Sequence, residues 1–311
     1  MNPLRIVDIG AHVPASRQTV AEAARELALP AMEGRLFERF YGLSSLPYEA
    51  GGSLWSLHQP AVAALAARHP ELGRSLDLIV FTHTLPAITP LHGGRLAARL
   101  AAMLDCRAEV MDLSLGHCAT ALAALPLLAA RLKPGRQALL LAGERGFHPQ
   151  LRVLPATTIM GEAACAVLLQ PDAGGFLVEG VHARHDGRFC RNSGHQREAD
   201  GPAFAAHYPT LLVAHLRDSL RRFGLTVDQL KLVLPHNVNA PSWQAALRQL
   251  AWPQDKLYLD NIARYGHCFG ADPFLNLRHA LAEGRLARGD RALLVAVGMG
   301  ATLASALVRL I

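Results

Sequence analysis

Apolar residues recur along the chain with two spacings, and each spacing predicts a different kind of element. Unbroken apolar runs of strand length include LDLIVFT (76–82) and LKLVLPH (230–236). Between such runs lie longer segments whose apolar residues are three and four positions apart, which is typical of helices. These segments are 21–29, 56–70, 93–104, 119–132, 210–224, 240–251 and 272–286. Strands that alternate with helices predict an α/β fold with parallel sheets covered on both faces.

Two parts of the chain repeat each other. RLKPGRQALLLAGERG (131–146) and RLARGDRALLVAVGMG (285–300) are identical at half of their aligned positions, without gaps. The same offset pairs LDLIVFT with LKLVLPH, and Gly116 with Gly270. Three matches in one register predict a duplicated α/β unit.

The duplication predicts two domains, residues 1–170 and 171–311. Sheets of this class place their sites at the carboxyl ends of the strands. Cys118, His236 and the Gly-Met-Gly turn at 298–300 all follow predicted strands. We therefore expect the functional site where these three segments meet.

The composition narrows the class of protein and its partners. Of 311 residues, 51% are hydrophobic and 18% charged, which permits a large core and argues against disorder. The net charge of +6 comes without a dense block of Lys and Arg, so we expect no nucleic-acid partner. The start, MNPLRIVDIG, is strand-like rather than a signal peptide, and charged residues interrupt every long apolar run. Five cysteines without a CxxC pair favour reduced thiols, so we expect a cytoplasmic protein with no membrane span.

Cys118 is the first candidate for chemistry. It lies between the predicted strand 108–115 and the predicted helix 119–132, after a Gly-His pair. Backbone N–H groups and the dipole at a helix N-terminus favour a thiolate, and a tight turn there can supply an oxyanion site. The alternative is a buried structural cysteine, which is the interpretation we give to Cys106, Cys165 and Cys268.

Two histidine segments could supply partners for this thiol. His236 follows a predicted strand in VLPHNVN (233–239), where we expect solvent to reach it and where it could act as a base or donor. His267 lies in a Gly-flanked loop before a helix that Pro273 would begin. The duplication aligns this loop with the Cys118 turn, so that Asp272 is the counterpart of Cys118. Taken alone, His236 is better explained as a loop residue.

A metal site is a weaker hypothesis. HARHDGRFCRNSGH (182–195) contains His182, His185, Cys190 and His195, but their spacing is not that of a standard zinc motif. The segment is polar and is better interpreted as a solvated loop over the mouth of the site. We therefore predict no metal.

These motifs resemble a known family. GHCATAL (116–122), HNVN (236–239), YGHCFGADPF (265–274) and GMGATLASALVRL (298–310) are similar in order and spacing to the ketosynthase III enzymes of the thiolase-like superfamily. TTIMGEAACAVLL (157–169) resembles a glycine-rich loop of that family. The resemblance implies a thiolase-like fold, with duplicated halves forming a five-layered α-β-α-β-α core, in a homodimer.

The resemblance also implies roles for individual residues. Cys118 would be the acylated nucleophile, and His236 and His267 would complete the catalytic set. The backbone N–H groups of Cys118 and Met299 would form the oxyanion hole. Three further residues would bind substrate: Asn239, Gly298 and Gly300.

Several positions depart from the family pattern. The third catalytic residue is usually Asn, and here it is His267. The Trp and Arg that hold coenzyme A in the family fall on Leu36 and Phe40, and an arginine near the carrier-protein site falls on Pro241. His117 before the nucleophile is also unusual. Together these departures favour an enzyme of a specialised lipid or secondary-metabolite pathway.

The predicted activity is acyl transfer in two steps, with no cofactor. An acyl thioester, on coenzyme A or an acyl carrier protein, would load Cys118. We expect a malonyl-type thioester then to undergo decarboxylative Claisen condensation. Two alternatives stay open: transfer to an alcohol or amine without decarboxylation, and an inactive subunit that assists a catalytic partner.

Overall fold

Strands form a mixed sheet that runs through the whole molecule. The computed structural model describes residues 2–84, 94–114, 116–147, 149–192 and 200–311. In these residues nine strands share one hydrogen-bonded sheet, in the order β11-β12-β13-β10-β1-β9-β6-β4-β5. The strands are β1 (Arg5–His12), β4 (Leu76–Thr82), β5 (Glu109–Leu113), β6 (Gln137–Ala142), β9 (Ala164–Gln170), β10 (Phe176–His185), β11 (Leu232–Pro235), β12 (Arg291–Gly298) and β13 (Thr302–Leu310).

The prediction of parallel sheets is only partly correct. The pairs β4–β5, β4–β6 and β11–β12 are parallel, whereas β1, β9, β10 and β13 pair antiparallel with their neighbours. A short connection explains one of these pairs, because the few residues between β12 and β13 allow only an antiparallel pair. The first-half and second-half strands are joined through β1 and β10, where Arg5 pairs with Leu177 and Ile6 with Phe176.

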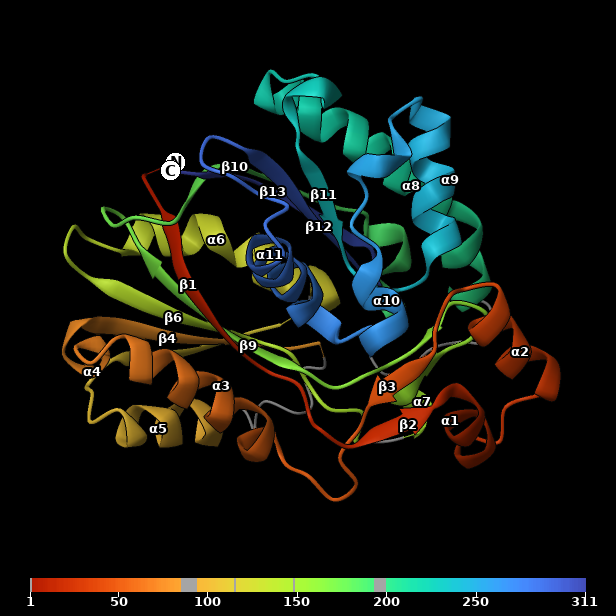
Figure 1. Cartoon of the computed structure of the whole chain (residues 1–311), viewed down its shortest axis with the longest axis horizontal. Coiled ribbons are helices and arrows are strands. Elements are labelled where there is room, and N and C mark those ends of the chain that lie inside the picture. Colours follow the sequence, from red (N-terminus) through yellow and green to blue (C-terminus); the bar gives the residue numbers. More distant parts are fainter. Residues whose placement is uncertain (1, 85–93, 115, 148, 193–199) are drawn as a thin grey trace.

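Helices cover the sheet in layers (Figure 1). On the outer face of the first-half strands lie α3 (Leu54–Arg68) and α5 (Gly94–Met103), and on that of the second-half strands lie α8 (Asp200–Phe223) and α9 (Ala240–Leu250). Between the two groups of strands lie α6 (Thr120–Arg131) and α11 (Asp272–Ala282). The result is the predicted five-layered α-β-α-β-α arrangement.

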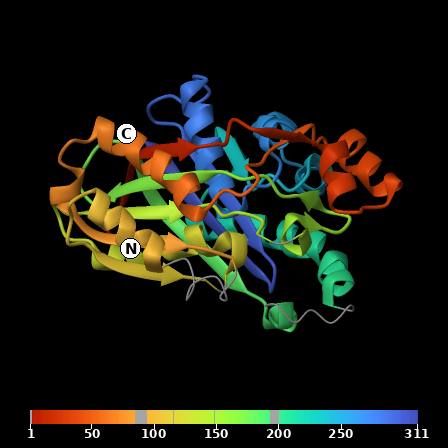
Figure 2. The same ribbon diagram turned by 90° about the horizontal axis from the view of Figure 1, so that it is seen from below.

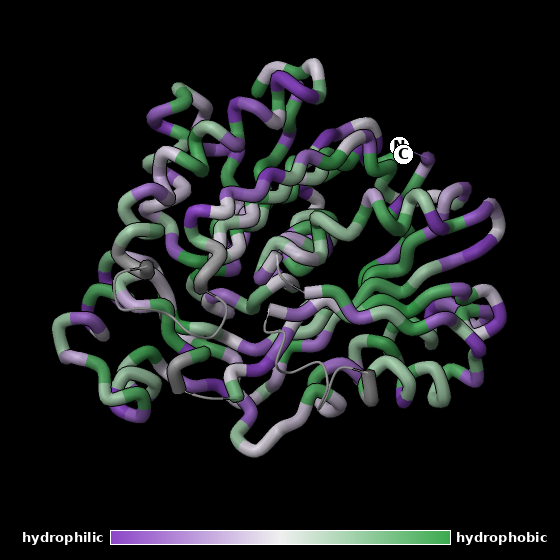
Figure 3. Tube along the Cα trace, turned by 180° about the vertical axis from the view of Figure 1, so that it is seen from behind, coloured by the Kyte–Doolittle hydropathy of each residue, from purple (hydrophilic) through white to green (hydrophobic). Residues whose placement is uncertain are grey.

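Strand alternation in β4 shows why separate cores form on the two faces of the sheet. Leu78 and Val80 pack into the central cluster with α6 and α11, whereas Ile79 and Phe81 pack outward against α3 and α5. Successive side chains of a strand point to opposite faces, so an unbroken apolar run buries both. Figure 3 shows the hydrophobic colour following the strands and hydrophilic segments gathering on the outer helices and loops.

Smaller elements extend one end of the molecule, where α1 and α2 are the red helices at the edge of Figure 2. These elements are β2 (Arg17–Thr19), α1 (Val20–Glu26), α2 (Ala31–Arg39), β3 (Ser45–Pro47), α7 (Pro149–Arg152), β7 (Val153–Leu154), β8 (Thr158–Ile159) and α10 (Asp260–Tyr265), and α4 (Leu72–Ser75) precedes β4. The predicted helices are confirmed to within a few residues at their ends, except that α8 begins at Asp200 and not at 210. Pro209 lies inside α8, and a proline is normally interpreted as a helix boundary.

Candidate active site

Cys118 lies on a tight turn between β5 and α6, in the short 3-10 helix His117–Ala119. The preceding residue, His117, has φ +49°, which turns the backbone sharply. Gly298 at the end of β12 packs directly on this turn, since a Cβ there would lie 2.0 Å from the carbonyl oxygen of Gly116. The sequence thus brings two glycines together where a nucleophile must be held between two chain segments.

Cys118, His267 and Asp272 form a continuous hydrogen-bonded series. Cys118 Sγ lies 3.2 Å from Nε2 of His267, and Nδ1 of the same ring lies 2.5 Å from Oδ2 of Asp272. The three side chains are almost fully buried, with 8% of Cys118 exposed. A nucleophile, a base and a carboxylate that orients the base are the parts of a catalytic triad.

Asp272 accepts hydrogen bonds from four donors. Its Oδ2 accepts from the backbone N–H of Asn237 at 2.6 Å and from His267, and its Oδ1 accepts from Cys268 N–H at 2.8 Å and Asn237 Nδ2 at 3.2 Å. A carboxylate with several donors is stabilised in its charged form. It also begins α11, where the helix dipole favours a negative charge. The network fixes which nitrogen of His267 faces the thiol.

The electrostatic environment makes His267 a strong base. Burial alone lowers the pKa of its imidazole, but attraction to Cys118 and Asp272 and the hydrogen bonds to both outweigh burial. The net result raises the pKa of His267 to about 10. This ring therefore holds a proton readily beside the sulfur, as a thiol-activating base must.

His236 lies next to His267, but the pKa values of the two rings are shifted in opposite directions. The two ring centroids are 5.3 Å apart. The backbone N–H of Val297 donates to His236 Nδ1 at 3.2 Å, which places the ring proton on Nε2. Burial, and then the neighbouring His267, lower the pKa of His236 well below its ordinary value. The expectation that solvent reaches His236 is wrong, because only 2% of the residue is exposed and Trp243 Nε1 donates to its carbonyl.

For the remaining predicted residues the structure gives contacts within the protein, and substrate binding by Asn239, Gly298 and Gly300 stays a prediction. Gly300 lies beside the His117 ring, and Met299 stands between the two glycines of the turn that packs on Cys118. The oxyanion hole from Cys118 and Met299 N–H groups stays a prediction. Asn239 caps α9 by accepting from Ser242 N–H, and its Nδ2 donates to the carbonyl of Thr157. Its amide thus holds two backbone segments together.

Among the described residues, no three His, Cys, Asp or Glu side chains are grouped as metal ligands. His182 hydrogen-bonds to Ser219 and His185 to Thr302, while His195 lies outside the described residues.

Two further predictions concern a membrane span and coenzyme A. Within the part of the chain that the structure describes, no helix combines the length and the apolar character that a membrane span needs. Phe40, at one of the family's coenzyme A positions, is exposed.

The sequence reasoning missed two residues of the site. Asp272 was interpreted only as the counterpart of Cys118 in the duplication, although its place five residues after His267 and before a helix-starting proline was a usable signal. Tyr208 gave none, because it precedes Pro209 in a segment where no helix was predicted. Its hydroxyl lies 3.3 Å from His236 Nε2.

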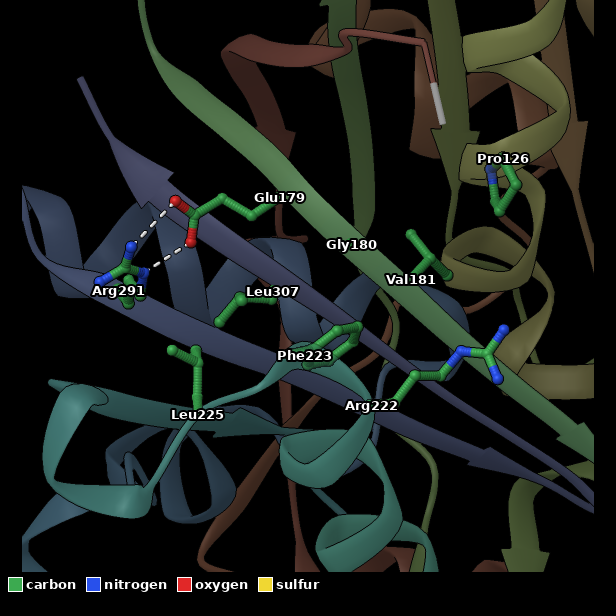
Figure 4. Close-up of a pocket in the computed structure, with 9 residues that line it drawn as sticks. All are labelled: Pro126, Glu179, Gly180, Val181, Arg222, Phe223, Leu225, Arg291 and Leu307. Atoms are coloured by element: carbon green, nitrogen blue, oxygen red, sulfur yellow. Dashed lines mark hydrogen bonds and ion pairs between the residues drawn. The ribbon is translucent and has the colours of Figure 1, made fainter.

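A cavity of about 560 Å³ lies elsewhere, lined by Pro126 of α6 and by residues of β10, β12 and β13 and the end of α8 (Figure 4). Its lining includes Phe223 and Arg222 at the end of α8, and Glu179, which pairs with Arg291. None of the catalytic candidates contributes to it. The candidate active site at Cys118 is therefore separate from this cavity.

Comparison with known proteins gives related sequences and folds. Residues 220–310 match the family model described as 3-Oxoacyl-[acyl-carrier-protein (ACP)] synthase III C terminal. A beta-ketoacyl-[acyl-carrier-protein] synthase III from Sphingopyxis alaskensis is 31% identical over 252 residues, 75% of this chain and 76% of the relative. One with the same description from Roseiflexus castenholzii is 30% identical over 170 residues, so the match spans 49% of this chain and about half (51%) of that relative.

Solved structures give the same fold. A structure titled ChlB3 [Aceyltransferase] has a TM-score of 0.84 at 19% identity, covering 99% of this chain and 98% of its own. 3-oxoacyl-(acyl carrier protein) synthase III from Pseudomonas aeruginosa PAO1 has a TM-score of 0.79 at 23% identity, with the same coverage. These matches confirm the predicted fold class.

Proposed function

The chain belongs to the beta-ketoacyl-[acyl-carrier-protein] synthase III family, and from this premise we propose that it is an acyltransferase that carries its acyl group on Cys118. The observation that supports this proposal is the series Cys118–His267–Asp272, with its 3.2 Å contact between sulfur and imidazole. The thioester is the substrate, and the proposed mechanism uses no cofactor.

In the first half-reaction, His267 Nε2 takes the thiol proton and Cys118 Sγ attacks the thioester carbonyl. The tetrahedral oxyanion would be stabilised by the N–H groups of Cys118 and Met299. The carrier thiolate then leaves and takes its proton from His267. Cys118 ends as an acyl thioester, and His267 returns to a neutral ring with a lone pair at Nε2.

For the second half-reaction, this proton balance favours an acceptor with an O–H or N–H group. His267 in the acyl-enzyme can remove the acceptor's proton, and Asp272 stabilises the imidazolium that forms. The acceptor oxygen or nitrogen attacks the acyl carbon, Cys118 sulfur leaves, and His267 returns the proton to it. An ester or amide results without decarboxylation.

Decarboxylative condensation is the second candidate, favoured by the state of His236. Its Nε2–H can donate to a malonyl thioester carbonyl as carbon dioxide leaves and an enolate forms. Condensation needs a second hydrogen-bond donor beside His236, and the family usually provides this donor with Asn. His267 can donate from Nε2 only when it is protonated, because Asp272 takes the Nδ1 proton. The raised pKa of His267 favours that state in the free enzyme, but acylation removes the attraction to Cys118, which is one cause of the raised pKa.

The first test is whether Cys118 carries the acyl group, which both candidates require. We expect intact mass to show one acyl group on the wild type after incubation with acyl-coenzyme A or acyl-carrier protein, and none on Cys118→Ala. Cys106→Ala, which removes a half-buried thiol outside the site, is the matched control. An unmodified wild type with every donor would refute the acyl-enzyme and support an inactive partner subunit.

The variant His267→Asn then tests the acceptor. It restores the residue that the family usually has, which donates a hydrogen bond but cannot act as a base. We expect transfer to an alcohol or amine to be lost in this variant. If wild-type acyl-enzyme instead releases carbon dioxide from malonyl thioesters, and His267→Asn retains that activity, condensation is the function.

The remaining proposals concern assembly and location. We propose a homodimer that takes its acyl group from coenzyme A or an acyl carrier protein in the cytoplasm, within a specialised lipid or secondary-metabolite pathway. The modest basic charge of +6 suits an acidic carrier. Sedimentation and a comparison of loading rates with both carriers test these statements.

A further inference from the structure

Tyr208 meets the site at the atom through which His236 can donate a proton. Its hydroxyl oxygen lies 3.3 Å from His236 Nε2. Because Val297 N–H occupies Nδ1, the ring proton is on Nε2 and the phenol oxygen accepts it. Among the described residues the Tyr208 hydroxyl makes no second hydrogen bond, so its own proton is available to a ligand.

Aromatic packing holds this phenol in place. Tyr208 lies on α8, and its ring contacts Phe204 edge-on at 5.9 Å; Phe204 in turn contacts Phe189 at 5.6 Å. Phe189 is buried, which anchors this row of rings to the 3-10 helix Gly187–Asn192. Burial raises the pKa of Tyr208, so the phenol keeps its proton at neutral pH. A fixed, protonated phenol beside a catalytic histidine is a preorganised donor.

We propose that Tyr208 is a further substrate-contacting residue, which donates its O–H to an oxygen that the acceptor carries close to its nucleophilic group. His236 supports the donor by giving its Nε2–H to the phenol oxygen. The acceptor class is therefore an amine or alcohol with a second oxygen, such as a hydroxyl or carbonyl, a few bonds from the attacking atom. This inference rests on the proposed acyl transfer from Cys118.

The test compares two probes that differ only at that oxygen. Acyl-Cys118 is prepared with octanoyl-coenzyme A, and its discharge by 2-aminoethanol and by propylamine is followed by mass in single turnovers. In Tyr208→Phe we expect Cys118 to load at the wild-type rate. Discharge by 2-aminoethanol should fall about tenfold or more, the typical effect of losing one buried hydrogen bond, with propylamine unchanged.

Tyr258→Phe is the matched control, because it removes a hydroxyl that donates to Glu283 away from the site. A fold defect would slow both probes and the loading step together. The inference is overturned if Tyr208→Phe affects both probes equally, or leaves 2-aminoethanol as fast as in the wild type. Failure of Cys118 to load at all refutes the proposed function, and an acyl-enzyme that no probe discharges refutes the acceptor step; either result overturns this inference as well.

Discussion

Two similar turns lead into the two central helices, and the chemistry at each is different. The 3-10 turn His117–Ala119 before α6 presents the thiol of Cys118, whereas the 3-10 turn Phe269–Ala271 leads into α11, whose first residue, Asp272, presents a carboxylate. The two turns face each other, since a Cβ on Gly270 would lie 3.4 Å from the Cys118 carbonyl oxygen. His267 lies between them and contacts both side chains.

The difference shows how two similar turns can serve different functions. A thiol that must meet substrate retains some exposure, and 8% of Cys118 is exposed. A carboxylate that must stay charged away from water needs donors, and Asp272 is fully buried with Asn237, Cys268 and His267 around it. Burying an ion is costly unless it is paired and hydrogen-bonded. Asp272 and its donors therefore hold His267 in place beside Cys118.

The largest effect is expected when the carboxylate of the second turn is neutralised. In Asp272→Asn, acylation of Cys118 should fall by about 10⁴-fold, as when a triad carboxylate is replaced. Loss of this negative charge also lowers the pKa of His267, because Asp272 is one of the groups that raise it. Stopped-flow loading with acyl-coenzyme A measures the rate.

Asp260→Asn, at the exposed start of α10, is the control for this variant. Because an amide cannot accept from all of the surrounding donors, thermal unfolding is measured alongside. A folded Asp272→Asn enzyme that loads at the wild-type rate would contradict the triad.

A smaller effect is expected from crowding the contact between the turns and their neighbours. Gly298→Ala would place a Cβ 2.0 Å from the Gly116 carbonyl oxygen, so the turn must move. Such overpacking typically costs about 1–3 kcal/mol of unfolding free energy. We expect a lower Tm and slower loading of Cys118.

Gly270→Ala is the matched comparison. Its new Cβ would meet the Cys118 carbonyl oxygen at 3.4 Å and the Ala121 Cβ at 3.8 Å, which are ordinary contacts. We expect a change in Tm near zero. Equal losses in the two alanine variants would show that the nucleophile turn is not held by Gly298.

The elements of the fold could be predicted from the sequence, but the direction of strand pairing could not. The periodicity of apolar residues predicted the helices and the layers, because the strands of the central sheet bury both faces and read as apolar runs. It did not predict the antiparallel pairs, since apolar runs look alike in either direction. Cys118, His236 and His267 were found because they follow strands or lie between glycines.

The orientation of those side chains was beyond sequence reasoning. Nothing in the spacing distinguishes His267, held by Asp272, from His236, held by Val297 N–H. Their opposite pKa directions arise from contacts between segments far apart in the chain. Tyr208 reaches the site only because α8 begins before Pro209.

The smallest expected effect on activity concerns buried histidines in the outer layers of both halves, where a change acts on stability. His58 on α3 and His215 on α8 are fully buried, and burial lowers their pKa values to about 4 and about 3. Between those values and about 6.5 only the unfolded chain binds the proton, so stability falls as pH decreases. Each such histidine contributes a slope of up to about 1.4 kcal/mol per pH unit below pH 6.5.

The variant His58→Gln tests this statement in one half while His215 stays as an internal reference. Its amide can still donate to the Gly143 carbonyl, which His58 Nε2 contacts at 2.9 Å, but it does not titrate. Denaturant unfolding between pH 4.5 and 7.5 should give a shallower acid slope in the variant, whatever its stability at pH 7. An unchanged slope would mean that His58 is not held neutral by burial.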